Sequence, residues 1–212
     1  MNNNVEYFYK YIEENFIDAD IKKPLFYNFP IGIRFELGNP NQVLQKNYMK
    51  QVYERSLTLF EEIFDENDEM YLMVYANRNI CDKKKTQIFN HFLKEKSLKY
   101  NIGYKKLPFV HYEDDERWET RQFILKCKKH DLYYKRLLTA IANMDTLNVP
   151  AIKQDNECYF VNIDKGIIFH MYDDRGLDVV AKSIKTIEPL YTNYKNWILS
   201  YDREEIDSLF IK

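Results

Sequence analysis

The side chains with the clearest capacity for chemistry lie close together between residues 170 and 178. They are one histidine, three aspartates and one arginine: His170, Asp173, Asp174, Arg175 and Asp178. Paired carboxylates beside a histidine could bind a divalent cation or share acid–base work, because two close carboxylates push each other's pKa apart. This cluster is therefore the first candidate for a metal-assisted hydrolytic site.

The same residue types are also what a tight turn requires. Asp accepts backbone N–H groups and Gly takes a positive φ angle, so Asp173-Asp174-Arg175-Gly176 is typical of a turn between two strands. In a strand over residues 167–172, His170 would face one side of the sheet, while Asp173 would lie toward the other. The favoured interpretation is a turn, with His170 as a core histidine that has one hydrogen-bonded nitrogen. A turn can still carry binding residues on a rigid framework.

Arg34 and Glu36 form a second polar pair. In residues 31–37, Ile-Gly-Ile-Arg-Phe-Glu-Leu, apolar residues alternate with Gly or charge, which predicts a half-buried strand. Arg34 and Glu36 then project from the same face of that strand. A cross-strand ion pair is the favoured interpretation, and the lining of a groove is the alternative.

A lysine-rich segment is the third candidate. Residues 82–106 contain eight lysines against Asp82 and Glu95, with aromatic residues interleaved. Such a pattern could follow a nucleic-acid backbone. The favoured interpretation is a solvated helix face that Phe89 and Phe92 anchor to the core, with its charge offset by the acidic run 113–116. Nucleic acid is therefore an unlikely partner.

The motifs of the large enzyme classes are absent from the sequence. There is no P-loop, GxGxxG, GxSxG, HExxH or EF-hand loop, and the chain has only 5 Gly. Cys81, Cys127 and Cys158 are far apart, and none lies near a histidine at zinc spacing. We therefore expect three reduced thiols, no metal and no cofactor.

Composition indicates a globular cytoplasmic protein. The 212 residues carry 31 Lys+Arg against 33 Asp+Glu, and 45% are hydrophobic, which is enough to build a sizeable core. The N-terminus lacks the basic flank and apolar stretch of a signal peptide. The longest run without a charge, residues 24–33, is much shorter than the roughly twenty residues of a membrane helix. No membrane association is expected.

The sequence pattern of the helices and strands that must position these residues predicts an α+β fold. We expect a single domain over residues 1–212, with an N-terminal helix at 5–17. A largely antiparallel sheet of about five to six strands should end in a C-terminal β-meander, with helices packed on one face. Asp202 and Glu205 have the spacing of a capping box for a last short helix.

The C-terminal third resembles a known family. The run from Phe169 to Ala181 and the segments Trp197-Ile198-Leu199 and Tyr201-Asp202-Arg203 resemble the bacterial family named domain of unknown function 3885, as do Gly32 to Leu37 upstream. The resemblance is most specific over residues 155–210. It implies a small soluble bacterial protein and no mechanism. The meander followed by a helix with aromatic residues is also similar in architecture to the SMI1/KNR4-like immunity proteins.

These observations favour a non-enzymatic protein-binding module, in its most specific form a toxin-immunity protein with a basic partner such as a toxin. Electrostatic complementarity from acidic loops could speed capture of such a partner. The expected contacts are first Asp173, Asp174, Arg175 and Asp178, and second Glu113, Asp114 and Asp115. Two alternatives stay open. One is a metal-assisted hydrolase that uses His170, Asp173 and Asp174 with Arg34 and Glu36, and the other is nucleic-acid binding through residues 82–106.

Overall fold

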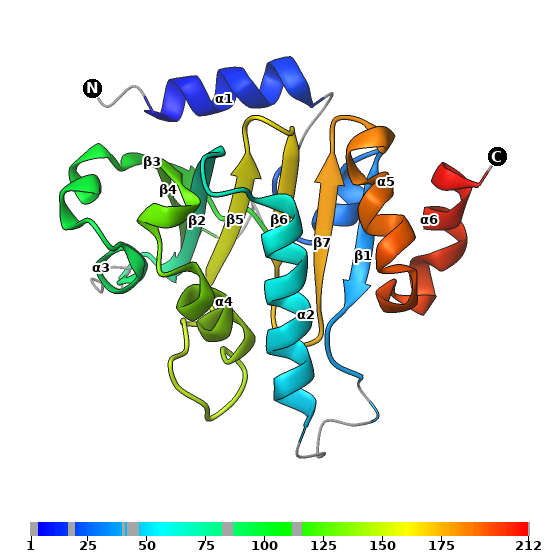
Figure 1. Ribbon diagram of the computed structural model, residues 1–212. Coiled ribbons are helices and arrows are strands. Elements are labelled where there is room, and N and C mark those ends of the chain that lie inside the picture. The colour runs from blue at the N-terminus through cyan, green and yellow to red at the C-terminus, as the bar shows by residue number, and fades with distance from the viewer. Residues whose placement is uncertain are drawn as a thin grey trace.

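The computed structural model describes residues 4–16, 20–39, 41, 47–81, 87–111 and 116–211. In this part of the chain one sheet of seven strands has the order β1-β7-β6-β5-β2-β4-β3, and every neighbouring pair is antiparallel (Figure 1). The strands are β1 (Gly32–Glu36), β2 (Glu69–Asn79), β3 (Gly103–Pro108), β4 (Trp118–Lys128), β5 (Asn156–Asn162), β6 (Ile167–Met171) and β7 (Gly176–Ala181). The predicted α+β class and the C-terminal meander are confirmed.

Strand β2 lies inside the sheet because both of its faces are apolar. It pairs with β4 on one side and with β5 on the other. Alternate residues belong to two separate core clusters, Leu72 to one and Met73 to the other. A strand that buries both faces gains stability only where layers cover the sheet on both sides.

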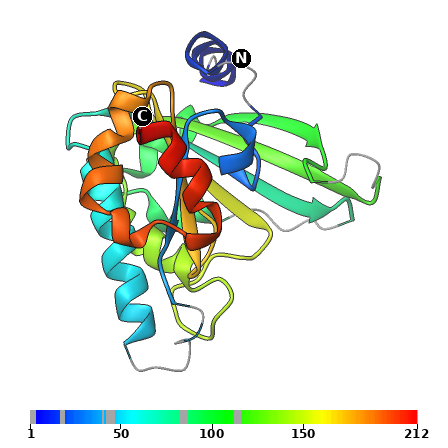
Figure 2. The same cartoon turned by 90° about the vertical axis from the view of Figure 1, so that its right-hand side faces the viewer.

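Helices cover the two faces unequally. One face carries α2 (Tyr48–Ile63), α3 (Ile88–Phe92), α4 (Tyr134–Ala142), α5 (Ile184–Asn193) and α6 (Arg203–Phe210), whose apolar side chains share one core cluster. The opposite face carries α1 (Asn4–Asn15), which inserts Phe8 and Ile12 beside Met73. Figure 2 shows α1 well separated from α2 and α5. The prediction of helices on one face therefore describes most of the helices but leaves out α1.

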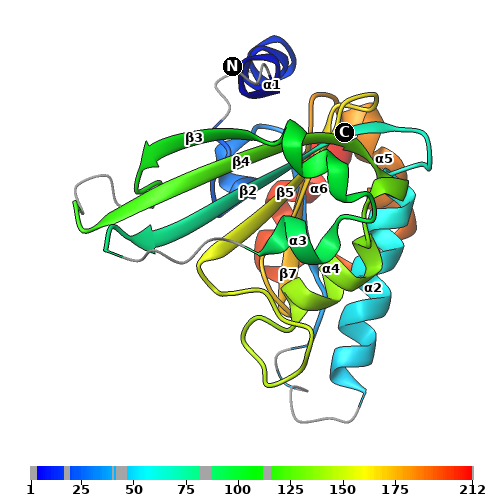
Figure 3. The same cartoon turned by 90° about the vertical axis from the view of Figure 1, so that its left-hand side faces the viewer.

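The expected number of strands is too low by one or two. The additional strand is β3, which begins within the lysine-rich segment 82–106, extends two residues beyond it and pairs with β4. Its sequence, Gly-Tyr-Lys-Lys-Leu-Pro, has no apolar alternation, because β3 is an edge strand whose residues are mostly exposed. Figure 3 shows β2, β3 and β4 extending beyond the helical layer.

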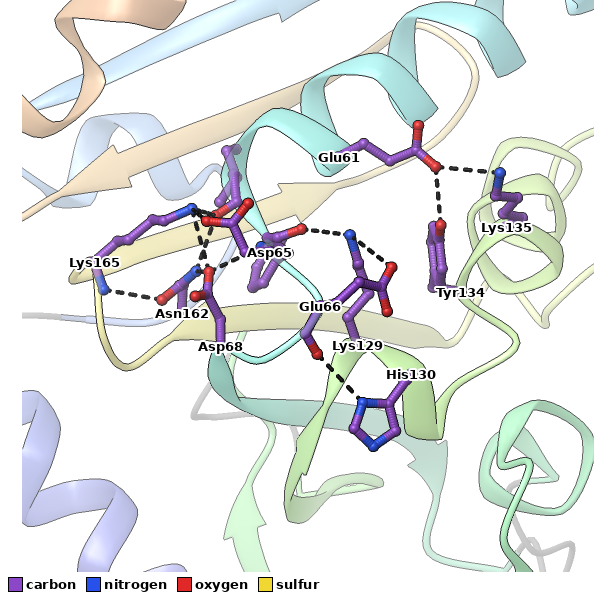
Figure 4. Close-up of polar contacts among 12 residues, drawn as sticks. Glu61, Asp65, Glu66, Asp68, Lys129, His130, Tyr134, Lys135, Asn162 and Lys165 are labelled. Atoms are coloured by element: carbon purple, nitrogen blue, oxygen red, sulfur yellow. Dashed lines mark hydrogen bonds and ion pairs between the residues drawn. The ribbon is translucent and has the colours of Figure 1, made fainter.

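Two lysines close the C-terminal end of α2 (Figure 4). Lys165 Nζ donates to the Ile63 carbonyl at 2.9 Å and lies 2.8 Å from Asp65 Oδ2. Lys129 Nζ donates to the Phe64 carbonyl at 2.7 Å and lies 3.2 Å from Glu66 Oε1. The last carbonyls of a helix have no partner within it, and cations there also complement the helix dipole. These contacts fix α2 against the strand ends.

Candidate functional site

Three polar residues form a row across neighbouring strands on the face of the sheet opposite α2. Asp178 on β7 lies directly between Arg34 on β1 and His170 on β6. Arg34 Nε donates to Asp178 Oδ1 at 3.0 Å, and the Phe26 backbone N–H donates to Asp178 Oδ2 at 3.0 Å. Burial raises the pKa of the fully buried Asp178, and Arg34 and the Phe26 N–H act against this shift. Of the two residues for which a cross-strand ion pair was predicted, Arg34 forms one, with Asp178, whereas Glu36 forms none within the described residues.

Arg34 is held from a second side by distant segments of the chain. Its Nη1 donates to Asp202 Oδ2 at 3.1 Å and to the Tyr27 hydroxyl at 3.0 Å. The Tyr27 hydroxyl in turn donates to Asp202 Oδ1 at 2.7 Å. Tyr27 lies on the short helix η1 (Leu25–Asn28), and Asp202 ends η6 (Ser200–Asp202).

The capping-box prediction for Asp202 is wrong. Helix α6 does begin after Asp202, but the side chain makes no capping hydrogen bond. Its carboxylate binds Arg34 and Tyr27 instead. Both carboxylate oxygens are thus engaged in charge-assisted hydrogen bonds away from the helix, Oδ2 with Arg34 and Oδ1 with Tyr27.

The Asp173–Gly176 turn is ordered by its own side chains. Asp173 Oδ1 accepts the Arg175 backbone N–H at 2.8 Å, and Asp173 Oδ2 accepts Arg175 Nε at 2.9 Å. The Leu37 N–H donates to the Arg175 carbonyl at 2.9 Å and ties the turn to the end of β1. The predicted acceptance of a backbone N–H by an aspartate in this turn is confirmed.

The prediction of a positive φ for the glycine of this turn, Gly176, is wrong. Its φ is not positive; the positive value occurs at Gly166, in the β5–β6 turn. A Cβ at Gly176 would lie 2.2 Å from the Tyr172 hydroxyl and 2.7 Å from the Phe35 carbonyl oxygen. Glycine is needed here because the two chain segments approach so closely.

A cleft of about 590 Å³ opens beside this turn. We call it the acidic cleft. Its lining comes from the segment before η1, β1, the loop 144–154, the β6–β7 turn and the segment before η6: Lys23, Pro24, Arg34, Glu36, Gly38, Met144, Asp145, Gln154, Tyr172, Asp173, Arg175 and Leu199. Four predicted site residues, Arg34, Glu36, Asp173 and Arg175, thus line one cavity. The groove that was the alternative interpretation for Arg34 and Glu36 is present.

Among the described residues, three cations and three carboxylates line the acidic cleft, but most of the cations are paired with carboxylates outside the lining. Lys23 lies 3.5 Å from Glu157 Oε1, Arg34 is paired with Asp178 and Asp202, and Arg175 is paired with Asp173. Each lining cation therefore has its own carboxylate. Glu36 and Asp145 have no ion pair with any residue in the described ranges, although Asp145 Oδ1 accepts a hydrogen bond from Gln154 at 2.6 Å. Glu36 is attracted to Arg55 and Asp145 to Arg175, but neither has a direct ion pair within the described residues. The cleft has an acidic excess because Glu157, Asp178 and Asp202, which lie outside its lining, already pair with its cations.

A buried polar network lies next to the acidic cleft, joined to it by Lys23. Glu157 accepts hydrogen bonds from Asn77 Nδ2 at 2.8 Å and from the Tyr159 hydroxyl at 2.7 Å, and lies 2.5 Å from His111 Nε2. Burial opposes ionisation of Glu157, but the hydrogen bond from His111 and the charges of Lys23 and His111 prevail and lower its pKa to about 2. Glu157 therefore stays ionised inside the fold.

The remaining predicted residues lie outside the acidic cleft. His170 is 1% exposed and stacks on Tyr159 with ring centroids 4.1 Å apart. Burial lowers the pKa of His170 to about 4, and its Nδ1 has no hydrogen-bond partner within the described residues. His170 is thus the predicted core histidine, but this nitrogen is unbonded. Asp178 lies buried behind Arg34, and Asp174 is partly exposed and does not line the cleft.

The structure gives less support to the metal-site and nucleic-acid hypotheses. Within the described ranges, no group of three or more His, Cys, Asp or Glu side chains is arranged to hold a metal ion. Residues 82–86 of the lysine-rich segment and the run Glu113, Asp114 and Asp115 lie outside the described residues. Phe89 and Phe92 are buried, as the anchored-helix interpretation predicted. Among the described helices, none is long and apolar enough to cross a bilayer.

Sequence reasoning missed several cleft and network residues. Lys23, Asp145, Gln154 and Glu157 lie in different segments, and the pattern around each of them carries no local signal of a site. They meet only because the sheet order places β1 and the meander side by side. Asp202 carried a signal, but the capping spacing suggested a different role.

Comparisons with known proteins give a family and one informative relative. The family model described as domain of unknown function (DUF3885) matches residues 8–202. The chain is 33% identical over 205 residues to "Uncharacterized protein YnaE" of Bacillus subtilis (strain 168), an alignment that covers 90% of this chain and 96% of that protein. No solved structure gives a significant match.

Proposed function

The chain belongs to the DUF3885 family, a domain of unknown function, and from this premise we propose that it is a non-enzymatic module that binds a protein partner through a basic side chain inserted into the acidic cleft. The observation that carries this proposal is the pair of carboxylates on the cleft wall, Glu36 and Asp145, that have no direct ion pair within the described residues. A Lys or Arg side chain of the partner would supply the missing positive charge.

The cleft is suited to recognition because its walls are held in place before binding. Arg34 has two carboxylate partners, and Arg175 is locked by Asp173 within the turn. Rigid charged groups lose little conformational entropy on association. The arrangement therefore favours selective capture of a cation and disfavours an anion.

The loop 144–154, which lines part of the cleft, also carries exposed apolar side chains. Leu147 is 103% exposed and Val149 is 88% exposed, and both lie in the loop that also supplies Met144, Asp145 and Gln154 to the cleft. Large apolar side chains in full contact with water are a feature of docking surfaces when they lie beside a polar anchor. This neighbourhood supports a protein partner over a small cation.

We propose a basic toxin as the first class of partner. The module would then act as an immunity protein. A cytoplasmic location agrees with the state of the thiols. Cys81, Cys127 and Cys158 are free, and burial raises the pKa of Cys127 and Cys158. Unpaired thiols are usual in a reducing compartment.

Charge reversal tests the proposal. The tagged full chain would be compared with the double variant Glu36→Lys/Asp145→Lys in affinity capture from host lysate, read by quantitative mass spectrometry. The matched control is Glu13→Lys/Glu188→Lys, which makes the same change in net charge at exposed positions outside the cleft. We expect a Lys- or Arg-rich protein to be captured by the wild type and by the control and lost with the cleft variant. Capture that is equal for all three forms would refute the assignment.

A further inference from the structure

A second cavity lies under α1, away from the acidic cleft. Its volume is about 270 Å³, and no residue lines both cavities. The walls are supplied by α1, the segment after it, β2, β3 and β4: Phe8, Tyr9, Ile12, Asp20, Ile21, Met73, Tyr75, Leu107, Pro108, Val110 and Gln122. We call it the aromatic pocket. A cavity of about 150 Å³ is enough to hold benzene, so this one can accept a substituted ring.

Two buried hydrogen-bond donors of the aromatic pocket, Gln122 Nε2 and the Tyr75 hydroxyl, have poor acceptors, whereas the Tyr9 hydroxyl donates to Gln122 Oε1 at 2.9 Å. Within the described residues, Gln122 Nε2 reaches only the Met73 sulfur at 3.3 Å and the Tyr75 hydroxyl at 3.5 Å. A thioether is a weak acceptor, and 3.5 Å is at the outer limit of a hydrogen bond. The Tyr75 hydroxyl proton has no acceptor in the described part of the chain. Buried donors of this kind usually have a partner, so their state points to a missing acceptor.

The charge of the lining limits the ligand further. Among the described residues that line the pocket, Asp20 alone is charged, and it is paired with Lys22 at 2.6 Å. This described lining holds no cation to neutralise a carboxylate or phosphate. Aromatic rings of Phe8, Tyr9 and Tyr75 offer edge and face contacts to a flat apolar ligand.

We propose that the aromatic pocket binds a neutral molecule with a single aromatic ring and a carbonyl oxygen, which accepts hydrogen bonds from Gln122 and Tyr75. The ring occupies the space between α1 and the sheet. Because Phe8, Tyr9 and Ile12 of α1 form part of the wall, binding would also hold α1 against the sheet. This site is independent of the acidic cleft, so the two proposals stand or fall separately.

Three probes on the folded full chain test the pocket by saturation-transfer NMR and titration: acetophenone, ethylbenzene and benzoate. We expect acetophenone to bind roughly two- to tenfold more tightly than ethylbenzene, since one or two net hydrogen bonds separate them. Benzoate should bind more weakly than both. Hydrogen exchange of the α1 amides should slow when acetophenone is added.

Variants identify the site. Tyr75→Phe should weaken acetophenone roughly two- to tenfold and leave ethylbenzene unchanged. Tyr71→Phe is the matched control, because Tyr71 lies on the same face of β2 but does not line the pocket. Val110→Trp should fill the pocket and abolish binding of both neutral probes, with circular dichroism confirming the fold. No saturation transfer from acetophenone to the folded wild type would overturn the proposal. So would equal acetophenone affinities for wild type, Tyr75→Phe and Tyr71→Phe.

Discussion

Arg34 is the side chain on which the contacts of the acidic cleft converge. Its guanidinium joins β7 through Asp178, η6 through Asp202 and η1 through Tyr27. Three directions of hydrogen bonding suit the planar fork of arginine and not the point charge of lysine. One residue thus fixes the relative positions of three segments that are distant in the sequence.

Removal of the charge on Asp178 should destabilise the protein strongly. Asp178→Asn keeps the shape of the side chain but leaves Arg34 with one carboxylate fewer in a buried position. Because a broken buried pair leaves an uncompensated charge, we expect a loss of about 3 kcal/mol in the free energy of unfolding, measured by urea denaturation. Asp155→Asn, at an exposed position, should change the value by less than about 0.5 kcal/mol. Equal losses for the two variants would contradict the role assigned to Asp178.

At the residue scale the sequence identified members of the cleft but not their partners. Alternation correctly placed Arg34 and Glu36 on one face, and turn chemistry correctly assigned Asp173 to a turn. That both Asp178 and Asp202 face Arg34 depends on strand register and on chain returns of more than 140 positions. Local pattern contains no information on such long-range contacts.

At the element scale, the end of α2 is fixed by side chains from the β4–α4 and β5–β6 connections. Lys129 lies in η4 (Lys129–Asp131) and Lys165 in the β5–β6 turn. The two lysines bind the adjacent carbonyls of Phe64 and Ile63 (Figure 4). The helix end is thereby positioned by the sheet.

Loss of the Lys129 ammonium should loosen this helix end. Lys129→Met keeps most of the buried aliphatic chain but leaves the Phe64 carbonyl without this donor. We expect a decrease of about 1–3 kcal/mol in the free energy of unfolding, together with faster hydrogen exchange in the last turn of α2. The control is Lys135→Met, which removes an exposed pair with Glu61 and should cost less than about 1 kcal/mol. Unchanged exchange in Lys129→Met would show that the carbonyl is satisfied without the lysine.

The elements that were predictable are those with a strong apolar pattern. Strands β1 and β6 fall within the predicted segments 31–37 and 167–172, because their burial demands apolar residues. Strand β3 could not be found in this way, since an exposed edge strand needs no apolar face. The position of α1 was also not predictable. Its apolar stripe required burial but did not specify which face of the sheet would receive it.

At the scale of the whole molecule, two buried titratable groups couple the fold to pH. His170 is neutral in the folded protein, and burial lowers its pKa from 6.5 to about 4. Glu157 is ionised, and despite burial its hydrogen bonds and nearby cations lower its pKa from 4.5 to about 2. In both cases the unfolded chain binds the proton more readily than the folded chain. Acid therefore favours unfolding at both sites.

The pH dependence of stability should consequently have two stages. The contribution of His170 is complete above pH 6.5 and is lost as the pH falls toward 4, whereas that of Glu157 is complete above pH 4.5 and is lost as the pH falls toward 2. Each stage corresponds to a loss on the order of 3 kcal/mol, measured by urea denaturation at successive pH values. His170→Phe keeps a ring against Tyr159 and should flatten the first stage while leaving the second. If the free energy of unfolding of the wild type were constant between pH 6.5 and 4, His170 would become protonated in the folded protein as readily as in the unfolded chain. That result would contradict the prediction and would show that Nδ1 of His170 has a hydrogen-bond partner in solution.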